Sequence, residues 1–246
     1  MDEHSAKLLK SGFKIIRLPN KIVIKNDKIT IIGNTDNTLW TTCGVLSEEC
    51  YGISSPDDYV VFDIGLNIGV AALYFAQDTK VKHIYGFEPF QKTYHQALLN
   101  IKNNENFSKK ITAYNFGLGS KNKDTTVSYN SELPGSMSTS IDRYAGIGVQ
   151  EVVKIRDVAE VLAPIIEKIK KERVLVKIDC EGSETEILTR LEETGLISSI
   201  DIFLMEWHFS PPKELLDILK RNMFISFFEH IVINELGFIR AINKNR

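Results

Sequence analysis

The order of hydrophobic and polar positions divides the chain into two unlike parts. Residues 13–32 carry short apolar runs separated by Asn-Asp and Gly-Asn, a pattern that predicts a small antiparallel meander. A helix is expected next, at residues 39–51. From residue 60 onward, continuous apolar runs alternate with longer segments of helical periodicity, which is typical of parallel strands joined by helices.

The second part predicts an α/β, Rossmann-like doubly wound sheet with right-handed crossovers. Strands are expected at 60–62, 82–87, 111–116, 174–178 and 201–206, and helices at 68–77, 91–103, 159–171, 183–195 and 212–222. Two late apolar runs leave almost no room for a helix between them, so they predict a hairpin and one antiparallel strand. We therefore expect a β-rich appendage at residues 1–55, which would contact a substrate or a second subunit, and an α/β domain at residues 56–246.

Composition narrows the function classes only slightly. The 246 residues are 43% apolar and 25% charged, with a formal net charge of -2 at pH 7, ordinary values for a globular protein. A broad nucleic-acid-binding face would normally carry a basic excess. Three cysteines without metal-site spacing, and the lack of a signal-peptide layout or a membrane-spanning run, predict a cytoplasmic protein with reduced thiols. A homo-oligomer is compatible with these data.

The turn after the first buried strand indicates a ligand. It contains Asp63, Gly65, Asn67 and Gly69 in the spacing Asp-x-Gly-x-Asn-x-Gly. Gly65 allows a tight turn, and Gly69 allows the next helix to pack closely. Because an acidic residue in this turn would repel a pyrophosphate, the turn favours a cationic or ammonium-bearing ligand.

Glu88 ends the second predicted strand in the stretch Gly-Phe-Glu-Pro. A carboxylate at this place accepts hydrogen bonds from both hydroxyls of a ribose. Together with Asp63, it describes a ligand with a ribose, no phosphates and an amine-bearing tail, and S-adenosylmethionine fits that description. The alternative is that the glycines serve packing only, which leaves both carboxylates unexplained.

Four stretches together resemble the FkbM family of S-adenosylmethionine-dependent methyltransferases. They are VFDIGLNIG at 61–69, GFEP at 86–89, VKIDCEGSE at 176–184 and MEWH at 205–208. The resemblance extends over about residues 56–243 and does not visibly include the first 40 residues. It implies a class I methyltransferase fold and methyl transfer to a hydroxyl of a sugar, polyketide or similar metabolite.

The resemblance also implies roles for single residues. Carried over to this chain, it places Asp63, Gly65, Asn67 and Gly69 around the methionine end of the cofactor and Glu88 on the ribose. It places Asn115 and Phe116, at the end of the third predicted strand, near the adenine.

Asp179, Glu206 and His208 follow the fourth and fifth predicted strands, so they are expected to meet at one edge of the sheet. A sugar hydroxyl has a very high pKa, so a base or a metal is needed beside it. Two carboxylates and an imidazole suit Mg²⁺ or Mn²⁺, which would lower the pKa of the hydroxyl. Without a metal, His208 or Asp179 would be the general base, and Glu206 would orient His208 or bind the acceptor. Both versions stay open at this point.

Nearby polar residues also have structural interpretations. Glu181 and Glu184 are expected to stabilise the N-terminus of the helix that follows them. Lys177 lies within a predicted strand, where its charge is expected to pair with Glu206 or Asp63.

The expected activity is methyl transfer to a hydroxyl of a sugar, or of an activated or phosphorylated sugar, in surface-polysaccharide or natural-product biosynthesis. An N-methyltransferase of a phosphorylated or amine-bearing metabolite and a non-catalytic scaffold are the alternatives. Nucleic acid is not an expected partner, because neither an Asn/Asp-Pro-Pro-aromatic motif nor a Pro-Cys motif is present. Hydroxyls at 136–139 would contact the substrate or form a polar loop.

Overall fold

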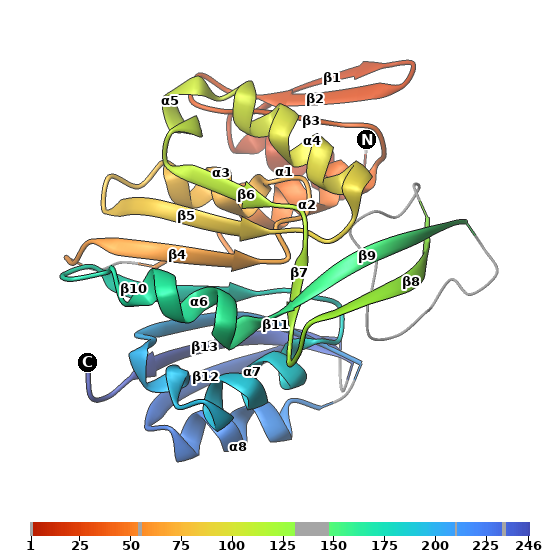
Figure 1. The fold of residues 1–246 in the computed structure, drawn as a ribbon. Helices are drawn as coiled ribbons and strands as arrows, with labels where there is room; N and C mark the ends of the chain where they lie inside the picture. Colours follow the sequence, from red (N-terminus) through yellow and green to blue (C-terminus); the bar gives the residue numbers. More distant parts are fainter. Residues whose placement is uncertain (1, 54–55, 131–147, 210, 233–234) are drawn as a thin grey trace.

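A seven-stranded sheet forms the centre of the molecule, in the order β12-β13-β11-β10-β4-β5-β6 (Figure 1). The computed structural model describes all residues except 1, 54–55, 131–147, 210 and 233–234. The central strands are Tyr59–Ile64 (β4), Val81–Phe87 (β5), Ile111–Tyr114 (β6), Arg173–Ile178 (β10), Ile202–His208 (β11), Phe224–Val232 (β12) and Leu236–Asn243 (β13). β13 runs antiparallel to both β11 and β12, so the predicted doubly wound sheet with an antiparallel closing strand is confirmed.

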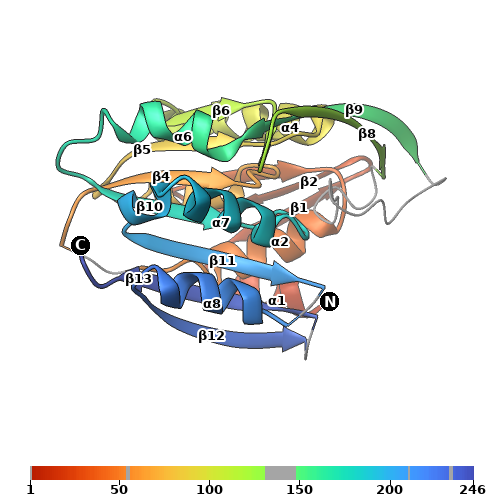
Figure 2. The same cartoon turned by 60° about the horizontal axis from the view of Figure 1, so that its bottom comes forward.

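Helices cover both faces of this sheet (Figure 2). On one face lie Val70–Ala76 (α3), Gln91–Lys102 (α4) and Glu105–Ser108 (α5), and on the other lie Val158–Ile166 (α6), Glu184–Glu193 (α7), Lys213–Arg221 (α8) and a 3₁₀ turn at Leu196–Ser199. Since successive side chains of a strand point to opposite faces, Val61 and Phe62 enter two different cores. Burial on both faces explains the continuous apolar runs in the sequence. None of the helices that the structure describes is long and apolar enough to cross a membrane.

The N-terminal segment contains the predicted meander, with strands Lys14–Leu18 (β1), Lys21–Lys25 (β2) and Thr30–Gly33 (β3). Its apolar side chains share one core with β4 and α3. Asn100 of α4 and Asn104, which precedes α5, accept hydrogen bonds from backbone N–H groups of β3. The appendage is therefore attached firmly to the sheet domain, while its role as a separate unit stays a prediction.

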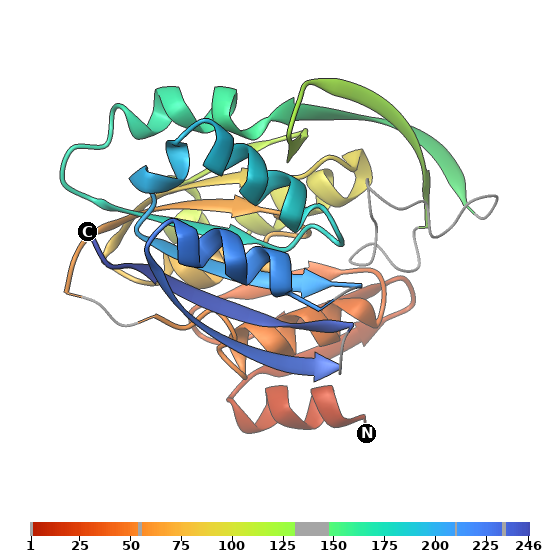
Figure 3. The same ribbon diagram turned by 90° about the horizontal axis from the view of Figure 1, so that it is seen from below.

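Two helices flank the meander, and the sequence predicted only one of them. Glu3–Lys10 (α1) packs along Asn37–Leu46 (α2) at the edge of the molecule (Figure 3). Asp2 caps α1 by accepting a hydrogen bond from the Ser5 backbone, a signal that the sequence carried. α2 was expected to reach residue 51, but Glu49 has a φ of 51°, so the chain leaves the helix earlier.

A small separate sheet follows β6. It consists of Gly117–Gly119 (β7), Lys123–Tyr129 (β8) and Val149–Asp157 (β9). The third predicted strand therefore ends at Tyr114, and the chain continues as β7 in another sheet. The hydroxyl-rich stretch 136–139 lies outside the described residues.

Candidate active site

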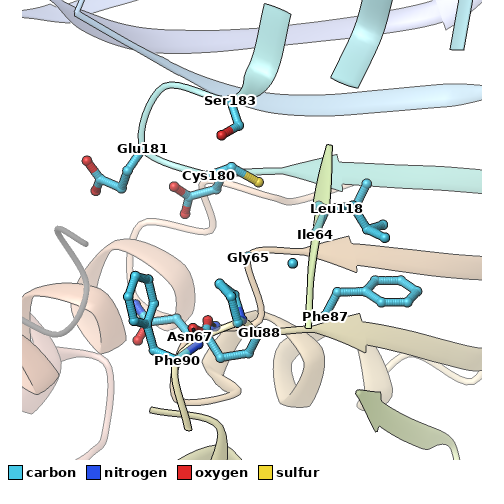
Figure 4. Close-up of a pocket in the computed structure, with 13 residues that line it drawn as sticks. Ile64, Gly65, Asn67, Phe87, Glu88, Phe90, Leu118, Cys180, Glu181 and Ser183 are labelled. Carbon is cyan, nitrogen blue, oxygen red and sulfur yellow. Dashed lines mark hydrogen bonds between the residues drawn. The ribbon is translucent and has the colours of Figure 1, made fainter. Parts of the chain in front are cut away.

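A cavity opens at the carboxyl ends of β4, β5 and β10 (Figure 4). Its lining consists of Ile64, Gly65, Asn67, Phe87, Glu88, Pro89, Phe90, Gly117, Leu118, Asp179, Cys180, Glu181 and Ser183. β4 and β10 are parallel neighbours, which brings Gly65 against the backbone of Asp179. Gly65 has a φ of 84°, and a Cβ there would collide with the carbonyl oxygen of Asp179, so only glycine fits.

Glu88 is the buried carboxylate of this cavity, with 5% of its surface exposed. Its two oxygens accept hydrogen bonds from backbone N–H groups, from Asn67 at 2.9 Å and from Phe90 at 3.0 Å. Burial raises the pKa of Glu88 to about 7, although the two N–H groups act against this shift. Each carboxylate oxygen has a second lone pair, so Glu88 can still accept hydrogen bonds from ligand hydroxyls.

Asp63 and Gly69, both predicted to touch the ligand, do not line the cavity. Asp63 is fully buried, and Lys177 Nζ lies 3.1 Å from its Oδ1 and 2.6 Å from the Gly65 carbonyl oxygen. Of the two partners expected for Lys177, Glu206 and Asp63, the structure shows Asp63. Burial lowers the pKa of Lys177, but the charges of Asp63 and Asp179 outweigh it and raise that pKa, so Lys177 stays charged. Gly69 faces Ala97 of α4 and serves helix packing.

Asn115 and Phe116, predicted to lie near the adenine, do not line the cavity either. The Asn115 side chain donates hydrogen bonds to the carbonyls of Glu88 and Pro89, and Phe116 packs on aromatic rings of β5 and β6. Gly117 and Leu118, two residues further on, line the cavity instead. The difference arises because the chain leaves the central sheet after Tyr114, earlier than the apolar pattern indicated.

The ends of β10 and β11 bring Asp179, Glu206 and His208 together, as the strand order predicted. His208 Nε2 lies 3.9 Å from Asp179, 3.7 Å from Glu181 and 3.8 Å from Glu206, in each case to a carboxylate oxygen. On the other side of the ring, Nδ1 lies 2.9 Å from Glu184 Oε1. One imidazole is therefore surrounded by four carboxylates.

Glu181 and Glu184 belong to this cluster, although the sequence predicted only helix capping for them. Glu184 does accept hydrogen bonds from the backbone N–H groups of Cys180 and Gly182, but it also holds the His208 ring. Asp179, Glu181 and His208 offer ligand atoms that all lie within 4.8 Å of one another. Glu206, which the sequence predicted as a metal ligand, is not part of that group, whereas Glu181 is.

The crowding of carboxylates changes two pKa values. Burial lowers the pKa of His208, but the hydrogen bond to Glu184 and the nearby acidic groups outweigh it and raise the pKa to about 9. Burial and the charge of Asp179 raise the pKa of Glu206 to about 8. His208 is therefore an imidazolium near neutral pH.

A second hollow borders the acidic cluster. It is lined by Glu181, Glu206, His208, Phe209, Val232, Glu235 and Leu236. Glu181 borders both the cavity and this hollow, so the acidic cluster lies between them. The described residues of the lining include three glutamates and no Lys or Arg.

The chain belongs to the FkbM methyltransferase family, because residues 63–239 match the family model described as the methyltransferase FkbM domain. It is 26% identical over 192 residues to Methyltransferase 1 of Beauveria bassiana (strain ARSEF 2860). This alignment covers 70% of this chain and 76% of that protein. It is 26% identical over 175 residues to Methyltransferase sdnD of Sordaria araneosa, covering 61% of this chain and 67% of that protein. The predicted family is confirmed.

A solved structure agrees with this family at the level of the fold. The crystal structure of Methyltransferase FkbM from Methylobacillus flagellatus KT aligns with a TM-score of 0.51 and 17% identity, over 83% of this chain and 53% of that chain. This chain thus corresponds to about half of that protein's length. The fold is that of class I S-adenosylmethionine-dependent methyltransferases.

Proposed function

We propose that this protein transfers a methyl group from S-adenosylmethionine to a hydroxyl group of a small metabolite, with a sugar as the acceptor class. The observation that supports this most is the position of Glu88, which lies in a strand-end cavity beside the acidic cluster. S-adenosylmethionine, when bound, supplies a methyl group that is already activated on a sulfonium cation. The carboxylates of Asp179 and Glu181 suit such a cation, whereas they would repel a pyrophosphate.

The cavity residues fit this cofactor. Glu88 would accept hydrogen bonds from the ribose hydroxyls, and Gly65 and Asn67 would leave backbone accessible to the ligand. Phe90 and Leu118 offer apolar surface for the adenine. The contact between Asp63 and the methionine ammonium remains a prediction. Because Asp63 is fully buried against Lys177 and does not line the cavity, this contact requires the two side chains to move apart.

Asp179 is the group best suited to remove the hydroxyl proton. His208 carries a proton near neutral pH, so it would act as a hydrogen-bond donor or as a positive charge, and not as the base. We call the cavity that contains Glu88 the cofactor cavity, and the hollow lined by Glu206 and His208 the acceptor hollow. Asp179 borders the cofactor cavity, and its Oδ1 lies 3.9 Å from Nε2 of His208 in the acceptor hollow. Glu206 would bind a second group of the acceptor.

In the alternative form of this mechanism, a bound divalent cation would lower the pKa of the acceptor hydroxyl. Asp179, Glu181 and His208 have the mutual spacing of a ligand set, and Glu184 holds the second ring nitrogen, as carboxylates do behind metal-bound histidines. Mg²⁺ or Mn²⁺ would be the expected ion, because carboxylates dominate the set.

The acceptor hollow favours a neutral or amine-bearing sugar over a phosphorylated one. Its described lining offers carboxylates for hydroxyl groups and apolar surface from Phe209, Val232 and Leu236, but no Lys or Arg for a phosphate. The carboxylates are also compatible with an amine, so methylation of nitrogen is the second candidate.

The test has two stages. S-adenosylhomocysteine is first titrated calorimetrically into metal-stripped protein, with and without Mn²⁺. Methyl-labelled S-adenosylmethionine is then offered with neutral sugars, amino sugars and sugar phosphates, and products are identified by mass spectrometry. We expect cofactor binding and a label on oxygen of a neutral or amino sugar. Absence of cofactor binding would overturn the proposal, and label on nitrogen would establish the second candidate.

A further inference from the structure

Tyr51 reaches the active site from the N-terminal segment, outside the residues that match the family model. Its side chain is 2% exposed, and its hydroxyl donates a hydrogen bond to Asp179 Oδ2 at 3.1 Å. The ammonium of Lys177 lies 5.6 Å from the centre of its ring, and the ring packs in a T-shaped arrangement with that of Phe238. A residue far away in the sequence thus touches the proposed base.

Arg240 of β13 holds the backbone on both sides of Tyr51. Its guanidinium donates hydrogen bonds to the carbonyls of Cys50 and Gly52, each at 2.7 Å. A guanidinium presents its donors in a rigid, planar fork, so it fixes two carbonyls at once. The position of the Tyr51 ring therefore depends on a strand near the other end of the chain.

These contacts give the two oxygens of Asp179 different surroundings. Oδ2 is held by the Tyr51 hydroxyl at 3.1 Å, with Lys177 Nζ at 3.6 Å, whereas Oδ1 lies 3.9 Å from His208 Nε2. Without the hydroxyl, the remaining strong attraction on Oδ2 is the Lys177 ammonium, which also pairs with Asp63. The carboxylate would then be free to turn toward Lys177.

We propose that Tyr51 is a positioning residue, which, with Arg240 holding its backbone, fixes the Asp179 carboxylate so that Oδ1 faces the reacting groups. This inference rests on the proposed function, because it assigns Asp179 to the methyl-transfer site. The N-terminal segment is in this sense part of the catalytic site and not only a covering layer.

The experiment uses two cofactor analogues and needs no acceptor. S-adenosylhomocysteine has a neutral sulfur, whereas sinefungin carries an ammonium group near the position of the transferred methyl. The ratio of their dissociation constants, measured calorimetrically on the full chain, therefore reports the negative charge that Asp179 presents there. We expect the wild-type protein to prefer sinefungin. Tyr51→Phe should lower that preference, because the released Asp179 carboxylate turns toward Lys177 and away from the ammonium group of the ligand. The expected decrease is about tenfold, the size of one hydrogen bond to a charged group.

Three further variants complete the test. They are Asp179→Asn, Arg240→Lys and the double variant that combines Tyr51→Phe with Asp179→Asn. If Tyr51 acts through Asp179, the pair Tyr51→Phe and Asp179→Asn will lower the preference no further than Asp179→Asn alone. Arg240→Lys should lower it as well, and Tyr94→Phe, which removes a hydroxyl bonded to the Ala113 carbonyl, should leave it unchanged.

Two results would overturn the inference in different ways. A wild-type preference in Tyr51→Phe, together with a reduced preference in Asp179→Asn, would show that Asp179 acts without help from Tyr51. Wild-type protein that binds neither analogue would overturn the proposed function, and the inference with it. Thermal melting of each variant separates a loss of positioning from a loss of folding.

Discussion

The cofactor side of the site, at the ends of β4 and β5, is shaped mainly by backbone, whereas the acidic side, at the ends of β10 and β11, is held by side chains. Glu88 receives both of its hydrogen bonds from backbone N–H groups, and Gly65 fits only because it lacks a Cβ. His208, in contrast, is oriented by Glu184, and Asp179 by Tyr51. Backbone contacts follow from a local turn, whereas side-chain contacts depend on elements that only the fold brings together.

This difference predicts that substitutions on the acidic side change catalysis and those on the cofactor side change binding. The largest effect is expected for Asp179→Asn. It should lower the rate of methyl transfer roughly 10²- to 10⁴-fold, the usual contribution of a general base. Affinity for S-adenosylhomocysteine, measured by calorimetry, should stay largely intact. A parallel loss of cofactor affinity would remove the distinction between the two sides.

The next effect concerns pH. His208 has a folded pKa of about 9 against 6.5 for the free side chain, so the folded state binds its proton more tightly. Stability from this group is complete below pH 6.5 and is lost as the pH rises to about 9, a difference of about 3 kcal/mol. Glu206, whose pKa is also raised, acts in the same direction. Urea unfolding at several pH values should show this decline.

Glu184→Gln should reduce the decline, because it removes the charge bonded to His208 Nδ1 while keeping an oxygen for the backbone N–H groups. Glu193→Gln, on an exposed position of the same helix, is the matched control. Equal pH profiles for both variants would mean that Glu184 does not set the charge of His208.

Gly65 and Gly12 form a matched pair for the cofactor side, since both have a φ of 84°. Alanine at Gly12 meets no atom within 4 Å, whereas at Gly65 it meets the Asp179 carbonyl. Gly65→Ala should therefore lower the free energy of unfolding by about 1–3 kcal/mol more than Gly12→Ala, as measured by urea titration. Equal losses would show that the turn has room to move.

The smallest effect is expected for Glu88→Gln, which keeps one acceptor oxygen. Affinity for S-adenosylhomocysteine should fall roughly tenfold, the value of a hydrogen bond to a charged group. Glu105→Gln, on the exposed helix α5, is the control. Wild-type affinity in Glu88→Gln would contradict the ribose assignment.

The fold could be predicted from the sequence because buried parallel strands produce apolar runs, such as 174–178, between helices. The strand ends were readable for the same reason, and with them Glu88, Asp179, Glu206 and His208. Asn115 and Phe116 do not line the cavity, whereas Gly117 and Leu118 do, because the apolar pattern continues past the point where β6 ends.

The positions of the strands and helices, the turn at Gly65 and the carboxylates that follow the strands could be determined from the sequence, since each depends on residues close together in the chain. The order of the strands in the sheet could not, because β10 pairs with β4, which lies more than 100 residues earlier in the chain. The tertiary structure decided which charges meet. In the folded chain Asp63 pairs with Lys177, Glu181 and Glu184 lie beside His208, and the Tyr51 hydroxyl binds Asp179. These contacts join segments far apart in sequence, so local periodicity and spacing did not fix them; for Lys177 the sequence left Glu206 and Asp63 as alternatives.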